Sequence, residues 1–181
     1  MKNPFVIGGT IYLRTIEESD LTSTYREWFN DADVCRFNSN HRFPNYDEDM
    51  HAFYERVIKP HHDIVLAIAD KETDEHIGNI SLVDIDTINR WGDIQILIGE
   101  KSHWGKGIGT EAVRLMLAHA FDELGLHRVR CGTSEDNIGM RKVAESLGFK
   151  EEGRSREAFW KGGVYRDIIH YGILSDEFKK A

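Results

Sequence analysis

Hydrophobic residues recur at two spacings along the chain, and the changes between them divide it into predicted helices and strands. Spacings of three and four residues, typical of a helix with one buried face, occur at 17–30, 47–58, 110–124 and 137–147. Strand-like alternation or short apolar runs occur at 10–15, 63–70, 77–84, 91–98, 127–133, 149–156 and 164–174. The predicted order of elements is therefore βααβββαβαββ.

This order indicates an α/β fold with a mixed sheet. No repeat, low-complexity tract or linker rich in proline and glycine interrupts the 181 residues. A chain of this length can bury a substantial core within one domain. We therefore expect residues 1–181 to form a single domain.

The stretch GKGIGT, from Gly105 to Thr110, directly precedes the predicted helix at 110–124. Glycine costs about 1 kcal/mol relative to alanine in a helix, so three glycines here suggest that exposed backbone is needed. First-turn amides lack partners inside a helix and carry partial positive charge, and glycine lets an anion approach them. The stretch predicts a pyrophosphate site, with Lys106 at its rim. The alternative is a tight turn that merely requires glycine.

Composition and charge narrow the classes of partner. The net charge is −8 with no basic run, which argues against nucleic acid and favours an amine-bearing partner. No apolar run approaches the roughly 20 residues that span a bilayer, and no signal-peptide core is seen, so we expect a cytoplasmic protein without membrane contact.

Cysteine and histidine add no further chemistry. Cys35 and Cys131 lie far apart without CxxC spacing, and we interpret both as small apolar residues in a reducing compartment. The adjacent His61 and His62 have no third ligand at a suitable spacing, so no metal site is expected.

Two longer stretches, IGEKSHWGKGIGTEAVRLMLAHAF and NIGMRKVAESLGFKEEG, resemble the GNAT superfamily of acyl-CoA-dependent N-acetyltransferases. The resemblance covers nearly the whole chain. Trp104 replaces the Arg or Gln usual in the family's pyrophosphate loop, which is typical of the branch with ribosomal-protein N-terminal, spermidine and amino-sugar acetyltransferases. The resemblance implies a single-domain GNAT fold. Its mixed, mostly antiparallel central sheet would have flanking helices and would splay at the cofactor strand.

The resemblance also implies a binding site for acetyl-CoA as cosubstrate. The pyrophosphate would lie on the loop formed by Trp104, Gly105, Lys106, Gly107, Ile108, Gly109 and Thr110. The pantetheine arm would meet main-chain groups of Ile96, Leu97 and Ile98. Asn137 is implied to contact this arm; its alternative role, the N-cap of the helix that follows, is compatible with such a contact.

Acetyl transfer from a thioester to an amine needs a group that accepts the amine's proton and donors for the carbonyl oxygen. Asp93 is the candidate base, where the resembling branch usually carries Glu; the shorter Asp would act through a water or only orient the amine, and the alternative is a polar residue at an exposed strand end. A main-chain N–H near Leu97 to Ile98 is the expected oxyanion donor. Relatives place a proton donor where this chain has Ala144 or Met140, so no acid is assigned.

We therefore expect an N-acetyltransferase that acts by direct transfer from acetyl-CoA to a primary amine. A peptide or protein N-terminus, a polyamine and an amino sugar all fit as acceptor. The alternative is a non-catalytic acyl-CoA-binding regulatory module. Ala144 and Met140 favour that module, whereas Asp93 and the intact loop of glycines favour an enzyme. Aromatic residues near the closing hairpin are interpreted either as pocket wall or as the contact of a homodimer; they are Phe159, Trp160, Tyr165 and Tyr171.

Overall fold

The elements of the fold follow the predicted order. The computed structural model describes residues 1–21, 23–59 and 63–178. In these ranges the strands are β1 (Pro4–Ile7), β2 (Ile11–Thr15), β3 (Ile64–Asp70), β4 (His76–Asp86), β5 (Trp91–Ile98), β6 (Arg128–Ser134), β7 (Lys150–Lys161) and β8 (Val164–Leu174). The helices are α1 (Ser23–Asn30), α2 (Asp47–Val57), α3 (Ile108–Asp122) and α4 (Ile138–Ser146), with short 3-10 turns at Glu18–Asp20 and Lys101–His103. The predicted α/β class is confirmed.

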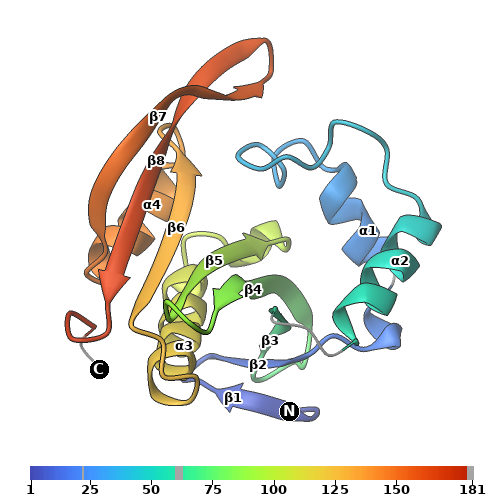
Figure 1. Cartoon of the computed structure of the whole chain (residues 1–181). Helices are drawn as coiled ribbons and strands as arrows, with labels where there is room; N and C mark the ends of the chain where they lie inside the picture. The colour runs from blue at the N-terminus through green and yellow to red at the C-terminus, as the bar shows by residue number, and fades with distance from the viewer. Residues whose placement is uncertain (22, 60–62, 179–181) are drawn as a thin grey trace.

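All eight strands of the described residues form one sheet, in the order β1-β2-β3-β4-β5-β6-β8-β7. Every neighbouring pair is antiparallel except β5 and β6, which run parallel with α3 as their crossover. The sheet is therefore mixed and mostly antiparallel, as the resemblance implied. Figure 1 shows β6, β8 and β7 diverging from β5, so the sheet splays at the cofactor strand.

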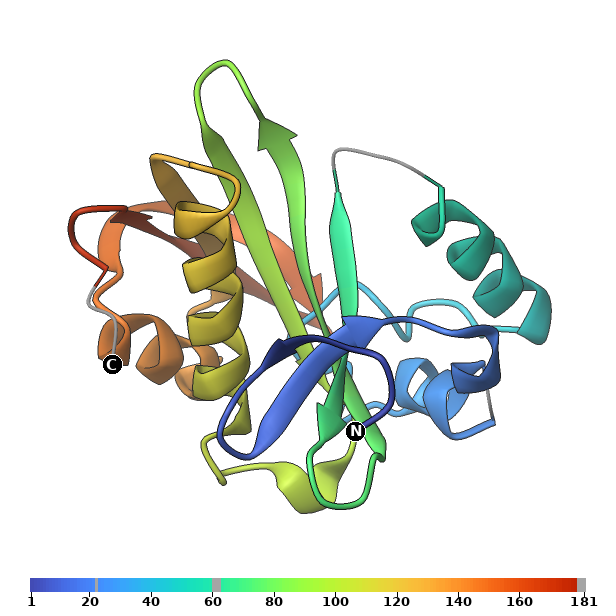
Figure 2. The same cartoon turned by 90° about the horizontal axis from the view of Figure 1, so that it is seen from below.

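Helices cover both faces of the sheet (Figures 1 and 2). On one face α3 and α4 pack through Ala112, Met116 and Ala144 into the main hydrophobic core. On the other face α1 and α2 form a second, smaller core around Tyr25 and Trp28. Strand β5 contributes to both, since Ile94 belongs to the first core and Leu97 packs against the second. This alternation places β5 at the centre of the molecule.

Strand β1 has no counterpart among the predicted elements. It is a four-residue edge strand that begins with a proline, and Phe5 and Ile7 are both about half exposed. Its pattern therefore lacks the alternation of buried and exposed positions that predicts a strand. Pairing with β2 holds it in place, together with a hydrogen bond from the Lys2 N–H to the Tyr12 hydroxyl (3.0 Å).

A buried ion pair joins β2 to the turn at Glu18–Asp20. Arg14 donates two hydrogen bonds to Asp20, of 2.6 and 2.7 Å, and the two side chains are 5% and 7% exposed. Burial alone would raise the pKa of Asp20. The hydrogen bonds from Arg14 and from the Glu17 N–H outweigh it and hold that pKa below its ordinary range. The pair thus stabilises the entry into α1 while Asp20 is ionised.

Replacing Asp20 by asparagine should lower the free energy of unfolding by about 3 kcal/mol, because the Arg14 guanidinium stays buried without a counter-charge. Urea denaturation at pH 7 measures the loss. Arg36→Gln is the matched control, since it breaks an ion pair to Asp33 whose side chains are 63% and 57% exposed. This control should cost less than about 1 kcal/mol. Equal losses in the two variants would contradict the role given to the buried pair.

The same pair predicts a pH dependence. A lowered pKa in the folded state adds stability above the unfolded-state pKa, and that stability is lost as the pH falls through the folded-state value. The difference in the free energy of unfolding between the wild type and Asp20→Asn should therefore reach its full size above the ordinary aspartate pKa of 3.8 and become smaller below it. A difference that stays constant down to pH 2 would count against this explanation.

Candidate functional site

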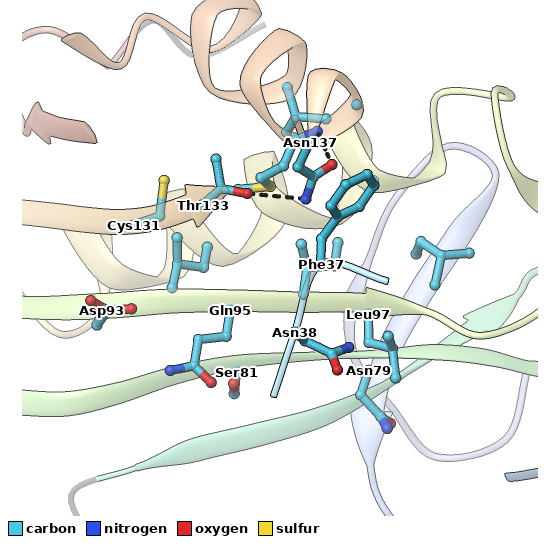
Figure 3. A pocket seen from close by; sticks show the side chains of 18 of the residues that line it. Phe37, Asn38, Asn79, Ser81, Asp93, Gln95, Leu97, Cys131, Thr133 and Asn137 are labelled. Carbon is cyan, nitrogen blue, oxygen red and sulfur yellow. Dashed lines mark hydrogen bonds between the residues drawn. The ribbon is translucent and has the colours of Figure 1, made fainter. Parts of the chain in front are cut away.

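Strands β5 and β6 separate soon after they meet. They pair only at Trp91 with Arg128, Gly92 with Val129, and Asp93 with Arg130. Both strands continue past these pairs, to Ile98 and Ser134. A cavity of about 1830 Å³ is lined by residues of both separated strands, by the loop at residues 105–110 (the glycine loop) and by α1, α2 and α4. This gap is the candidate active site (Figure 3).

The separation leaves main-chain groups of β5 facing the cavity. In an antiparallel pair, alternate residues bond to the partner strand. Gly99 donates to the Ile77 carbonyl at 3.0 Å, so by this alternation Leu97, which pairs with Asn79, also directs its main chain to β4. The main-chain groups of Ile96 and Ile98 consequently face the gap. Of the three residues implied for the pantetheine arm, Ile96 and Ile98 are thus oriented for such contacts and Leu97 is not.

The glycine loop lies at the end of this gap, at the start of α3. Gly105 and Gly107 have φ of 73° and 83°, and a Cβ added to either would meet nothing within 4 Å. Within the part of the chain that the structure describes, the N–H groups of residues 105–110 donate to no protein acceptor. The loop therefore presents free amides at the positive end of a 15-residue helix dipole.

Trp104 and Lys106 differ in where they point. The Trp104 indole N–H donates to the Ile98 carbonyl at 2.9 Å, which ties the loop to the end of β5 and occupies that acceptor. Trp104 lines the main cavity, whereas Lys106 lines a separate hollow beside it, together with Lys71 and His103. The Ile108 side chain is buried in the core, so only its main chain can face a ligand.

Asn137 caps α4 at the cavity wall. Its side-chain carbonyl accepts from the Met140 N–H at 3.1 Å, and its amide donates to the Thr133 hydroxyl at 3.0 Å (Figure 3). The N-cap interpretation is therefore correct. Asn137 also lines the cavity, so the two roles considered for it are compatible in space.

No side chain at the two expected acid positions can donate a proton. Ala144 is fully buried in the main core, and Met140 packs against it. Ser146 donates its hydroxyl hydrogen to the Val143 carbonyl at 2.9 Å.

Cys131 lines the gap, but its side chain is buried. Burial, together with the charge of Asp93, raises the pKa of its thiol to about 12. Cys131 is therefore neither a thiolate nucleophile nor an effective acid near pH 7.

Asp93 lies on the last residue pair before β5 and β6 separate, on the face opposite α3 and α4. Burial raises the pKa of its carboxyl, and the positive charge of Arg130 counters part of that rise. Arg130 donates through Nε to one Asp93 oxygen at 3.1 Å. A carboxylate with a raised pKa next to a cavity can serve as a proton acceptor.

Neutral polar and aromatic side chains line part of the cavity on the Asp93 side. Gln95 follows Asp93 on the same face of β5, and Ser81 lies opposite Gln95 on β4 (Figure 3). Phe37 and Asn38, from the loop between α1 and α2, also line the cavity. This half of the cavity therefore offers hydrogen-bonding groups beside an apolar wall.

Long-range contacts tie that loop to the β7–β8 hairpin. Lys161 donates to the main-chain carbonyls of Asn38 and Asn40, and Arg42 donates to the Trp160 carbonyl at 2.9 Å. We name these five hydrogen-bonded residues the loop–hairpin clasp. It fixes the loop over the cavity. Sequence reasoning missed the clasp and the Arg130 contact, because neither depends on a local pattern.

Two remaining expectations concern metal and membrane contact. Among the described residues, no group of three or more His, Cys, Asp or Glu side chains is placed to hold a metal ion. His61 and His62 lie outside those residues. No helix in the described ranges is long and apolar enough to cross a membrane.

The sequence and the fold both match known proteins. A profile of the acetyltransferase (GNAT) domain matches residues 10–150. The Bacillus subtilis protein named Probable N-acetyltransferase YjcK is 34% identical over 180 residues, covering 94% of this chain and 97% of that protein. The spermidine N(1)-acetyltransferase of Escherichia coli K12 is 26% identical, covering 93% of this chain and 88% of that enzyme.

A solved structure shares the fold closely. The crystal structure of spermidine N-acetyltransferase from Vibrio cholerae in complex with CoA and spermine superposes with a TM-score of 0.85. It covers 94% of this chain and 98% of that one, at 24% sequence identity. This likeness confirms the predicted arrangement of a mixed sheet with flanking helices.

The burial of both cysteines predicts their reactivity. Cys35 and Cys131 are 0% and 2% exposed, and burial raises the pKa of each thiol. The native protein should therefore show no rapid reaction with Ellman's reagent at pH 8, and both of its cysteines should react after denaturation in guanidinium. A thiol that reacts within seconds in the native protein would contradict the placement of these side chains.

Proposed function

The chain belongs to the GNAT acetyltransferase family and is an acetyl-CoA-dependent N-acetyltransferase, and from that premise we propose how its residues act. Acetyl-CoA lies with its diphosphate on the free amides of residues 105–110 and its thioester in the gap between β5 and β6. The acceptor amine approaches from the face that carries Asp93 and Gln95. The acetyl group passes directly between the two substrates.

One observation carries this proposal. A single cavity is lined both by the free amides of the glycine loop and by the carboxylate of Asp93. An anionic carrier and a reactive amine can therefore occupy it together, and holding two reactants in one site lowers the barrier to their reaction. The main-chain N–H groups of Ile96 and Ile98 lie along the cavity between the glycine loop and Asp93.

The residues present fit a direct transfer. The amine nitrogen attacks the thioester carbonyl carbon, and the bond from that carbon to sulfur breaks. The proton of the amine passes to Asp93, directly or through one water, and then to solvent. A main-chain N–H of β5 that faces the gap stabilises the negative charge on the carbonyl oxygen. The departing thiolate takes its proton from solvent, since Ala144 and Met140 have none to give.

A covalent acetyl-enzyme formed on cysteine finds no support in the cavity. Cys131 is the cysteine that lines it, and its buried thiol stays protonated near neutral pH. Direct transfer requires no such nucleophile. Replacing Cys131 by alanine would therefore affect packing rather than chemistry.

The acceptor is a primary amine of one of three classes: a peptide or protein N-terminus, a polyamine, or an amino sugar. The overall charge of −8 is not concentrated in the cavity. Its acidic lining residues are Asp33, Asp63, Asp84, Asp93 and Glu152, and its basic ones are Arg36, Arg56, Arg128, Arg130 and Lys142. The local balance removes the electrostatic preference for a polycation that the net charge suggested.

A panel of amines tests the function. Release of the CoA thiol from acetyl-CoA should be accelerated by at least one member among peptides, polyamines and amino sugars. Asp93→Asn should lower kcat/KM by about 100-fold or more, as expected for loss of a general base. Asp176→Asn, an exposed residue outside the cavity, is the control and should match the wild type. CoA binding without release by any amine would instead indicate a non-catalytic binding module.

The cofactor cradle can be tested separately from the chemistry. Gly107→Ala places a Cβ in the open space that faces the ligand, at a φ of 83°. We expect its affinity for CoA in calorimetry to fall about 10-fold or more, because charge-assisted hydrogen bonds to the diphosphate are lost. Gly162→Ala is the matched control. It has a φ of 61° and equally open surroundings, but it lies at the β7–β8 turn.

The two glycine variants should lose similar stability, about 1 kcal/mol each, because both force alanine into the left-handed region. Only the loop variant should lose affinity. Unchanged CoA binding by Gly107→Ala, or an equal loss in Gly162→Ala, would show that the diphosphate does not lie on these amides.

A further inference from the structure

Three side chains meet at the point where β5 and β6 part. Trp91 and Asp93 lie on the same face of β5, two residues apart, and Arg130 is the β6 partner of Asp93. The Arg130 guanidinium carbon lies 3.8 Å from the centroid of the Trp91 ring. Its Nε lies 3.1 Å from one Asp93 oxygen, Oδ2. The arginine is thus held by a stacked ring on one side and a carboxylate on the other.

Arg130 engages only one oxygen of the Asp93 carboxylate. Arg130 donates to Oδ2, and the Gln95 side chain is a second hydrogen-bonding neighbour of the carboxylate. The Asp93 side chain is 22% exposed and lines the cavity. The bond from Arg130 to Oδ2 therefore helps to fix the orientation of the carboxylate and does not itself engage Oδ1.

The other groups that face Asp93 are few. On β4, Asp84 lies beyond Arg130, with its carboxylate 3.9 Å from an Arg130 nitrogen, and its charge opposes ionisation of Asp93. On β6, Cys131 is a neutral neighbour whose thiol has its pKa raised by burial and by the charge of Asp93. On β5, Gln95 provides a neutral hydrogen-bonding group. Arg130 is accordingly the positive charge that faces this carboxylate.

We propose that Arg130 is a positioning residue for the acetyl-transfer reaction, which orients Asp93 toward the acceptor amine and keeps its carboxylate ionised at the pH of catalysis. The inference rests on the proposed role of Asp93 as base. Arg130 does not touch either substrate in this account. It acts through its stack on Trp91, which fixes the guanidinium, and through the single hydrogen bond to Oδ2.

Removing the charge should shift the pH dependence of the reaction. The acidic limb of the kcat/KM profile reports the pKa of the essential base in the free enzyme. Without the Arg130 guanidinium beside it, the Asp93 carboxyl stays protonated up to a higher pH. In Arg130→Met the midpoint of the acidic limb should therefore move up by about 1 pH unit or more. A merely structural role would lower activity without moving the midpoint.

Two further variants make the test specific. Arg130→Lys keeps a positive charge but loses the planar fork and the stack, so its midpoint should stay within about 0.5 pH units while kcat falls. Arg154→Met is the matched control. Arg154 is also 43% exposed and also forms an ion pair of 3.1 Å, with Asp167, but it does not line the cavity. Its profile should match that of the wild type.

The outcomes separate this inference from the function on which it rests. If Asp93→Asn abolishes activity and Arg130→Met leaves the midpoint unchanged, the proposed base stands and the role of Arg130 is overturned. If Asp93→Asn keeps the activity and the acidic limb of the wild type, the base itself is wrong and both proposals fall. Should Arg130→Met not fold, Arg130→Gln, neutral and closer in shape, gives the same comparison.

Discussion

The structure depends on one interruption of hydrogen bonding, the end of pairing between β5 and β6 after Asp93. Strands left unpaired inside a sheet expose main-chain donors and acceptors, and a buried group without a partner costs about 1–3 kcal/mol. The glycine loop adds a second set of free amides, at residues 105–110. Both sets of groups line one cavity. A ligand with a polar arm and a diphosphate can therefore form the hydrogen bonds that these main-chain groups do not form within the protein.

The remainder of the fold holds this gap open. The main core fixes α3 against β5, and the second core fixes α1 against the other face of the same strand. Gly99 lets α1 pack closely against the end of β5, because a Cβ at residue 99 would lie 1.9 Å from a ring carbon of Trp28. Trp28 in turn donates to Glu100 at 2.9 Å, just before the glycine loop. The start of α3 is thereby set relative to both halves of the cavity.

The sequence predicts the parts of this arrangement that depend on local patterns. Hydrophobic spacing gives eleven elements in the right order, and the alternating glycines mark the start of α3. Strand β1 is missed because an exposed edge strand has no such alternation. The contact of Arg130 with Trp91 and Asp93 depends on where a parallel pairing stops, and the hold of Lys161 on Asn38 joins residues 123 positions apart. No local pattern encodes either one.

The most direct test of the central claim is hydrogen–deuterium exchange at residues 105–110, measured with and without CoA. The account predicts fast exchange in the free protein, because these amides have no acceptor, and exchange slowed about 10-fold or more when CoA is bound. Amides that are already protected in the free protein would contradict it. So would unchanged exchange at these residues under conditions where calorimetry shows that CoA is bound.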